Sequence, residues 1–205
     1  MTTVVHPTAL VEEGVTLGVG TRVWDACHLR SGAVVGRDVT IGEKSYLAGG
    51  VHVGDNVKIN AFVYLCTGVT LESGVMVAAG AVFTNDRYPR ATEPDLSVLR
   101  PSDVTEDTLP TVVREGATIG ARAVVGCGLV IGRWAMVGMG AVVTRDVADH
   151  TLVVGAPARP IALVCRCGVP FARYPADAVP AGTYTCDRDG STYVVVGGRV
   201  TGDAW

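Results

Sequence analysis

The sequence predicts an all-β solenoid in which short strands, separated by tight corners, stack on one another. The chain of 205 residues contains 37 Val against 12 Leu, and Val favours pleated strands. Its 26 Gly are nearly twice the ordinary usage, which is typical of a chain with many tight corners. The third observation is that a large apolar residue recurs at every sixth position over most of the chain.

The six-residue period begins at Val5, is interrupted after Phe83, and resumes from Val113 to Val143. The apolar residues are Val5, Val11, Leu17, Val23, Leu29, Val35, Ile41, Leu47, Val53, Ile59, Leu65, Leu71, Val77, Phe83, Val113, Ile119, Val125, Ile131, Val137 and Val143. In a chain with 48% hydrophobic residues, chance gives such a series about once in two million trials. The period therefore reflects a repeated structural unit.

Two other positions of each repeat support the same interpretation. Four residues after each apolar residue stands a small one, such as Thr21 or Ala33, which we expect to point inward where room is limited. Three residues after many of them stands a residue that tolerates positive φ, namely Gly14, Gly20, Gly32, Asp38, Gly50, Asn56, Gly68, Gly74, Gly80, Gly116, Gly128, Gly140 and Asp146. Each repeat is thus a short strand plus a corner. Such units bury their apolar side only by stacking.

The chain departs from this period twice. Residues 84–110 contain four prolines and no regular apolar spacing, which predicts an extruded loop. A long loop in a compact domain is usually functional, although a functionless surface insertion is the alternative. The period ends near residue 160, which predicts a repeat domain over 1–160 and an appendage over 161–205.

Composition excludes several classes of protein. A net charge of −3 argues against a nucleic-acid partner, and no uncharged stretch, such as that between Lys58 and Glu72, is long enough for a membrane helix. The N-terminal stretch from Met1 to Glu13 lacks the basic and apolar regions of a signal peptide, so we expect a cytoplasmic protein. Its six Cys are then expected to be thiols or metal ligands rather than a disulfide framework.

Over residues 5–155 the pattern resembles the hexapeptide repeat of left-handed parallel β-helices. In that family three hexads form one triangular coil, which implies nearly seven coils for this chain. Most such enzymes with an extruded loop are acyltransferases that use acetyl-CoA. They are usually homotrimers with active sites between subunits.

The end of the repeat resembles the last coil and exit of these enzymes, in the stretches 139–147 and 154–160. The resemblance implies that backbone at Gly138, Gly140 and Ala141 contacts the pantetheine arm of the cofactor. It also implies that Arg159 binds a CoA phosphate, for which a bidentate guanidinium is suited. The alternative for Arg159 is a solvated surface charge.

At the start of the loop, Phe-Thr-Asn-Asp-Arg-Tyr-Pro-Arg (83–90) resembles a stretch of the N-acetyltransferases that act on UDP- or dTDP-linked amino sugars. Asp86 is then expected to orient the sugar amine and accept its proton, and Asn85 to donate to the substrate or the oxyanion. The expected substrate-binding residues are Arg87, Tyr88 and Arg90. The alternative is that Asn85 and Asp86 only turn the chain out of the coil.

Two details bear on the substrate. No His lies in or beside the loop, and His28 and His52 are expected at exposed corners, which favours an amine acceptor over a hydroxyl. The subgroup often carries Tyr-Glu-Gly where this chain has Cys66-Thr67-Gly68. The identity of the sugar, its nucleotide, the acetylated position and the acyl length therefore stay open. A non-catalytic trimeric scaffold is one rival, and a carbonic anhydrase, which needs three His around a metal, is a weaker one.

The appendage resembles the small zinc ribbon found at the end of some relatives. Its expected ligands are Cys165, Cys167, Cys186 and Asp189. A ribbon usually has four Cys, so Asp189 leaves open whether the site holds zinc or folds without it. The remaining Cys lie in the coils and are expected to pack there rather than bind metal.

Overall fold

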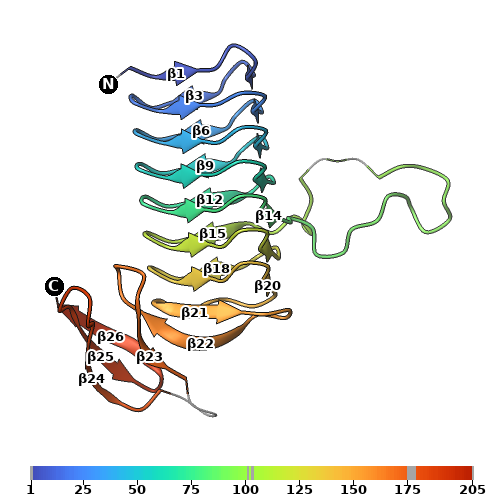
Figure 1. The fold of residues 1–205 in the computed structure, drawn as a ribbon. Coiled ribbons are helices and arrows are strands. Elements are labelled where there is room, and N and C mark those ends of the chain that lie inside the picture. Colours follow the sequence, from blue (N-terminus) through green and yellow to red (C-terminus); the bar gives the residue numbers. More distant parts are fainter. Residues whose placement is uncertain (1, 101, 103, 175–178, 205) are drawn as a thin grey trace.

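The computed structural model describes residues 2–100, 102, 104–174 and 179–204, so residues 101 and 103 of the predicted loop lie outside it. The described chain is built from strands alone (Figure 1), and it contains no helix able to cross a membrane. The coil strands are β1 Val4–Val5, β2 Leu10–Val11, β3 Thr16–Leu17, β4 Arg22–Val23, β5 His28–Leu29, β6 Val34–Val35, β7 Thr40–Ile41, β8 Tyr46–Leu47, β9 His52–Val53, β10 Lys58–Ile59, β11 Tyr64–Leu65, β12 Val69–Leu71, β13 Met76–Val77, β14 Val82–Phe83, β15 Thr111–Val113, β16 Thr118–Ile119, β17 Val124–Val125, β18 Val130–Ile131, β19 Met136–Val137 and β20 Val142–Val143. The strands that follow are β21 Thr151–Val154, β22 Arg159–Val164, β23 Pro170–Arg173, β24 Gly182–Thr185, β25 Thr192–Val196 and β26 Arg199–Ala204.

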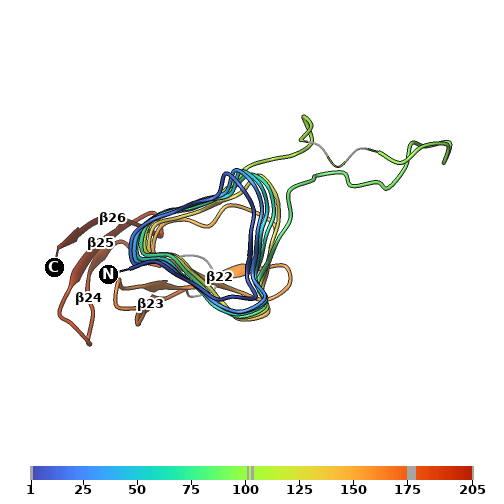
Figure 2. The same ribbon diagram turned by 90° about the horizontal axis from the view of Figure 1, so that it is seen from above.

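The coil strands form three parallel sheets, and every third strand belongs to the same sheet. Figure 2 shows the resulting triangular coils stacked along one axis. Val5 pairs with Val23, which stands three hexads further along the chain, so the predicted coil of three hexads is confirmed. An all-β parallel solenoid is therefore confirmed.

The predicted apolar period forms the core. All 20 of its residues are the last residue of a coil strand, and from Val23 onward all are buried. The small residues one position before the next strand are buried beside them, including Thr21 and Ala33, both 0% exposed. Large and small inward side chains thus alternate and fill the narrow interior.

The predicted positive φ at the corners is found at all but one of the predicted residues, and also at several corners that were not predicted. Every predicted corner residue has positive φ except Asp146, which lies where the repeat is ending, so this prediction was wrong. Corners without Gly, Asn or Asp also adopt positive φ, as at Lys44, Phe62 and Trp134. Stacking on the neighbouring coils holds these residues in the left-handed backbone conformation, which residues with a Cβ rarely adopt.

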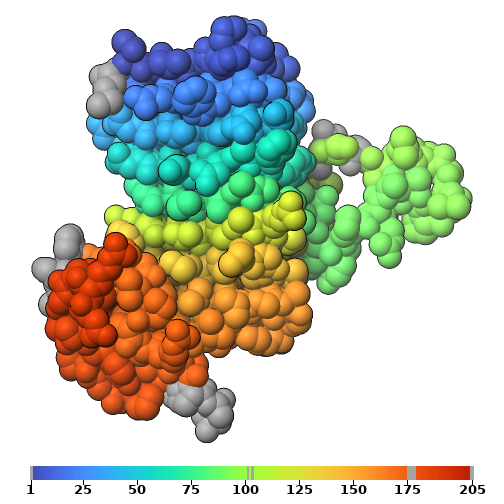
Figure 3. All heavy atoms as spheres, viewed as in Figure 1, coloured from blue at the N-terminus to red at the C-terminus, as the bar shows by residue number. Residues whose placement is uncertain are grey.

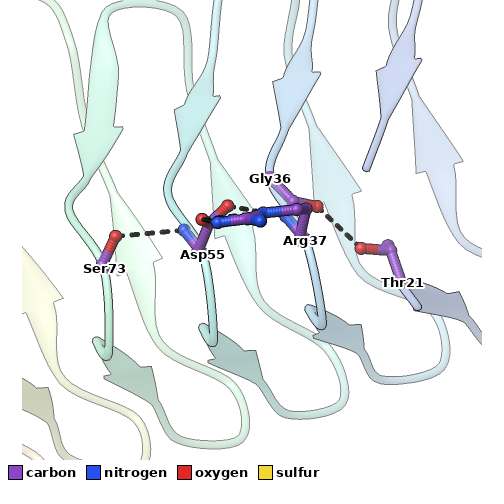
Figure 4. A network of polar contacts seen from close by, with 5 residues as sticks. All are labelled: Thr21, Gly36, Arg37, Asp55 and Ser73. Carbon is purple, nitrogen blue, oxygen red and sulfur yellow. Dashed lines mark hydrogen bonds and ion pairs between the residues drawn. The ribbon is translucent and has the colours of Figure 1, made fainter. Parts of the chain in front are cut away.

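Side chains join neighbouring coils at the corners (Figure 4). The guanidinium of Arg37 donates to Asp55 at 2.8 Å, and the backbone N–H of Arg37 donates to the same carboxylate at 2.8 Å. The N–H of Asp55 in turn donates to Ser73 Oγ at 3.1 Å. Since the members of each pair are three hexads apart in the sequence, each bond spans one coil.

Residues 85–109 leave the solenoid after β14 as a long arm that stands clear of the coils (Figures 1 and 3). Its described residues form no strand and are held by two isolated antiparallel bridges. Its root is closed by the pairing of Asp86 with Thr108, and its tip by the pairing of Thr92 with Leu99. The predicted extrusion is confirmed.

The appendage lies on the opposite side of the solenoid from the arm (Figures 1 and 2). Strand β22 pairs antiparallel with β21 of the last coil and runs through the predicted domain boundary at residue 160. Strands β24, β25 and β26 form a separate antiparallel sheet. The ring of Tyr193, which is fully buried, stacks on Phe171 and so joins the two parts of the appendage.

Candidate functional site

Two corners of the coil carry the predicted site residues. We call "loop corner" the turns that follow the strands of the seven-stranded sheet (residues 12–14, 30–32, 48–50, 66–68, 84–86, 126–128 and 144–146). We call "glycine corner" the turns that precede the same strands at the C-terminal end (residues 78–80, 120–122 and 138–140). One strand of the sheet therefore separates the two corners.

A cleft of about 1130 Å³ lies at the loop corner. The arm forms one wall of this cleft, and the corner turns of the preceding coils form the other. Of the predicted residues it brings together Asn85, Asp86, Tyr88 and Arg90, whereas Arg87 is exposed and does not line it.

The arm root fixes Asp86 through the backbone. Leu109 N–H donates to the carbonyl of Asn85 at 2.8 Å, and Arg87 N–H donates to the carbonyl of Asp107 at 3.2 Å. The exposed carboxylate of Asp86 accepts a hydrogen bond from Thr108 Oγ1 at 3.1 Å. The remaining lone pairs of Asp86 are available to an amine in the cleft.

Cys66 and Thr67 line the cleft beside these residues. Burial raises the pKa of the Cys66 thiol to about 12, and the charge of Asp86 adds to the shift. Cys66 is therefore a neutral thiol at physiological pH and does not serve as a nucleophile. This agrees with the predicted packing role of the cysteines in the coils.

The cofactor candidates meet in the last coil, at the other edge of the sheet. Gly138 N–H donates to the carbonyl of Val153 at 2.8 Å, Ala141 is fully buried, and Gly140 has open space where a Cβ would stand. The chain before Arg159 returns beside the same coil, where Ala158 N–H donates to the carbonyl of Val142 at 2.8 Å. Arg159 itself is exposed and donates to the carbonyl of Ala158 at 2.8 Å.

One copy of the chain does not bring the two groups together. The cleft that Asn85 and Asp86 line is not lined by Gly138, Gly140, Ala141 or Arg159. The two groups also lie on different coils, since β14 precedes β20 by two strands of the sheet.

The predicted metal ligands come together in the appendage. The ligand atoms of Cys165, Cys167, Cys186 and Asp189 all lie within 4.8 Å of one another. The Sγ atoms of Cys167 and Cys186 are 3.6 Å apart, close to the spacing of two thiolates on one tetrahedral zinc, about 3.8 Å. Cys165 Sγ accepts hydrogen bonds from Cys167 N–H and Tyr193 Oη, as thiolate ligands of a metal commonly do. This donor set fits a structural zinc ion.

The histidines do not form a metal site among the described residues. His28 and His52 lie in strands β5 and β9 and point outward from the sheets, so their expected place at corners was wrong. His28 is 2.7 Å from Glu12, whereas the buried His150 is 2.9 Å from the carbonyl of Val164. The three-His requirement of a carbonic anhydrase is not met by this arrangement.

Sequence reasoning missed part of the cleft wall. The cleft is also lined by Glu12, Arg30, Tyr46 and Tyr64, which lie four, three, two and one coil before the arm. The sequence did contain a signal for this wall, because His28, Tyr46 and Tyr64 are spaced by one coil each. That spacing places them side by side on one face of the solenoid.

Comparisons with known proteins agree with the repeat. The family model "Bacterial transferase hexapeptide (six repeats)" matches residues 50–85, and "Hexapeptide repeat of succinyl-transferase" matches residues 32–66 and 110–145. Over these residues the chain is similar to the hexapeptide repeats of bacterial transferases.

Among curated proteins, the chain is 39% identical over 57 residues to dTDP-3-amino-3,6-dideoxy-alpha-D-galactopyranose 3-N-acetyltransferase of Aneurinibacillus thermoaerophilus, covering 28% of this chain and 30% of that protein. It is 61% identical over 33 residues to acyl-[acyl-carrier-protein]–UDP-N-acetylglucosamine O-acyltransferase of Brucella anthropi, covering 16% of this chain and 12% of that protein. The matches thus span less than a third of these relatives. The predicted resemblance to nucleotide-linked amino-sugar N-acetyltransferases is confirmed.

Among solved structures, the chain is similar to a variant of AntD, an N-acyltransferase from Bacillus cereus in complex with dTDP and coenzyme A. The TM-score is 0.54 at 17% identity, over 80% of this chain and 85% of that chain. At this identity the likeness shows that the two proteins share a fold.

Proposed function

We propose that the protein is a CoA-dependent N-acyltransferase that moves an acetyl group from acetyl-CoA to the amino group of a UDP- or dTDP-linked amino sugar. The observation that carries the proposal is the position of Asp86. It is fixed at the root of the arm, its carboxylate opens into a large cleft, and the surrounding stretch is the one that resembles the amino-sugar N-acetyltransferases. The curated relative from Aneurinibacillus, an N-acetyltransferase of a dTDP-linked amino sugar, supports the same substrate class.

The proposed chemistry is direct transfer. The neutral amine nitrogen attacks the carbonyl carbon of the thioester, the C–N bond forms, and the C–S bond breaks to release CoA as the thiolate. Asp86 accepts the proton that the nitrogen loses, and the amide N–H of the Asn85 side chain stabilises the oxyanion. An amine needs less help from a base than a hydroxyl, so an exposed carboxylate is sufficient.

We infer that the working assembly is a homotrimer whose coils are left-handed. In a single chain the arm root follows β14 and the glycine corner at residues 138–140 precedes β20, so the two lie at opposite edges of one sheet and on different coils. A neighbouring copy is needed to place the thioester, held at Gly138, Gly140, Ala141 and Arg159, against Asp86. The site is complete only where the arm of one subunit meets the glycine corner of the next.

We also propose that residues 161–205 form a second unit in which Cys165, Cys167, Cys186 and Asp189 hold a structural zinc ion. Zinc would cross-link two segments of a sheet too small to fold alone, and the catalytic steps do not require it. We expect the protein to act in the cytoplasm.

Subunit mixing tests the proposal. An Asp86→Asn variant and an Arg159→Ala variant are refolded together. Activity is then assayed at an acetyl-CoA concentration too low for the Arg159→Ala protein to bind the cofactor and turn over. In mixed trimers, one interface pairs an intact Asp86 with an intact Arg159, so activity should exceed that of either variant alone. If mixed assemblies form and activity does not recover, the shared site is wrong. If the wild type binds no CoA, the scaffold alternative replaces the enzyme.

A further inference from the structure

The cleft at the loop corner is longer than a sugar ring. Arg30 follows β5 and Asn85 follows β14, three strands further along the same sheet. At about 4.8 Å per coil, their backbones are roughly 14 Å apart along the axis. Both residues nevertheless line the same cleft, so its N-terminal end is available to whatever is attached to the sugar.

The cation at this end is held in place by two fixed groups. Nε of Arg30 donates to Glu12 Oε1 at 2.7 Å, and Nη1 donates to Tyr46 Oη at 3.1 Å. Glu12 is anchored in turn by the backbone N–H of Ser31 at 2.8 Å and by His28 at 2.7 Å. The Ser31 amide, followed by His28 and Arg30, lowers the pKa of Glu12 to about 2, so this carboxylate stays charged at physiological pH.

The tyrosine that orients Arg30 is itself immobilised. The rings of Tyr46 and Tyr64 stack at 5.0 Å with an interplanar angle of 9°, and His28 packs edge-on against the other side of Tyr46. The two bonds described use two of the five N–H donors of the guanidinium. Arg30 lines the cleft and its side chain is 49% exposed, so its remaining donors are accessible to a ligand there.

We propose that this end of the cleft, Arg30 oriented by Glu12 and Tyr46, binds the diphosphate of the nucleotide-linked sugar while Asp86 holds the amine. A preorganised guanidinium donates two parallel bonds to phosphate oxygens. The head group of Arg30 reaches the level of Tyr46, two coils or roughly 10 Å from the arm root. A sugar ring and its glycosidic oxygen span a comparable length. The assignment rests on the proposed function, because it presumes that the amine lies at Asp86.

The test compares two arginines with similar ion pairs. Arg30→Gln removes the charge in the cleft, whereas Arg37→Gln removes an arginine paired with Asp55 at a different corner, outside the cleft (Figure 4). Binding of UDP, dTDP and CoA is measured by calorimetry, and kcat and KM are measured for the nucleotide sugar. We expect Arg30→Gln to weaken nucleoside diphosphate binding about 10- to 150-fold and to raise the KM similarly. CoA affinity and kcat should change little, and Arg37→Gln should match the wild type.

A second variant, Tyr46→Phe, tests the same subsite if the Arg30→Gln protein does not fold. Tyr46→Phe keeps the aromatic stack and removes only the hydroxyl that orients Arg30, so we expect a several-fold weaker diphosphate affinity at an unchanged melting temperature. Unchanged diphosphate affinity in both variants, or an equal loss in Arg37→Gln, overturns the subsite. If Arg30→Gln transfers acetyl groups with an unaltered KM, the diphosphate subsite is wrong and the proposed acetyltransferase function stands. If UDP or dTDP binding depends on Arg30 but no acetyl transfer occurs, the subsite stands and the proposed function is wrong.

Discussion

Asp86→Asn separates chemistry from folding at the proposed site. Asn has nearly the same size and can still accept the bond from Thr108 Oγ1, but it cannot take up the proton of the amine. A positioned general base contributes about 100- to 10,000-fold, and a partly deprotonated amine reduces that need. We therefore expect kcat to fall by at least about tenfold.

The structure limits the effect of the same change on stability. Asp86 is exposed, lies outside the apolar core, and makes one described side-chain hydrogen bond, at 3.1 Å. Such a bond is worth about 1 kcal/mol, which corresponds to about 2–4 °C in melting temperature for a chain of this size. The arm root is closed by backbone bonds that the substitution leaves intact.

Steady-state release of the CoA thiol and a thermal melt provide the two measurements. Asp107→Asn is the matched control, because Asp107 also lines the cleft and its described bond to the arm root is made by its backbone carbonyl. The loss in Asp86→Asn should shrink as the pH rises and more of the amine arrives deprotonated, while CoA affinity stays constant. Near wild-type activity at neutral pH, an equal loss in Asp107→Asn, or a melting-temperature drop large enough to explain the loss would refute the role.

Four further measurements test the assembly, the cofactor contact, the zinc site and the packing of the coils. Sedimentation should give a stable trimer, and a persistent 21.3 kDa monomer would remove the shared site. Arg159→Ala should weaken CoA binding about 10- to 150-fold but spare pantetheine, and equal loss for both ligands would exclude a phosphate contact. Asp189→Cys should bind zinc more tightly in a chelator titration than the wild type, whereas wild-type protein that keeps stoichiometric zinc through chelation would show that the carboxylate already suffices. Gly42→Ala should cost about 1–3 kcal/mol in denaturant unfolding, because a Cβ there would lie 2.6 Å from the backbone of Asn60. The control Gly182→Ala, whose Cβ meets nothing closer than 3.8 Å, should be near neutral, and similar costs for both would contradict the close approach of the coils.

The solenoid could be predicted from the sequence because its physics is local and repeated. The apolar residue of each hexad ends a strand and points inward. The six-residue period was therefore enough to predict the strands, the coils and the core together. The prediction of corner conformation was weaker. Phe62 and Trp134 adopt positive φ although their side chains disfavour it, because coils stacked on both sides determine the backbone there.

The site could be predicted only where residues are close in sequence. Asn85, Asp86, Tyr88 and Arg90 are close in sequence at the arm root and line one cleft, whereas Arg87, predicted with them, does not line it. The path of the arm depends on isolated bridges such as that of Thr92 with Leu99, which no regular apolar pattern in the sequence predicts. Arg30 lies far from Asp86 in the sequence, and only the three-dimensional stacking of coils brings both into one cleft.

The proposed reaction passes an acetyl group from CoA to a sugar nitrogen. The direct measurement incubates the protein with acetyl-CoA and UDP- or dTDP-linked amino sugars, then identifies the acetylated atom by mass spectrometry and NMR. We expect an amide on the amino group of at least one nucleotide sugar, with one CoA thiol released for each amide formed. No acetylated product from any of these sugars, or an ester on a hydroxyl beside a free amine, would contradict it.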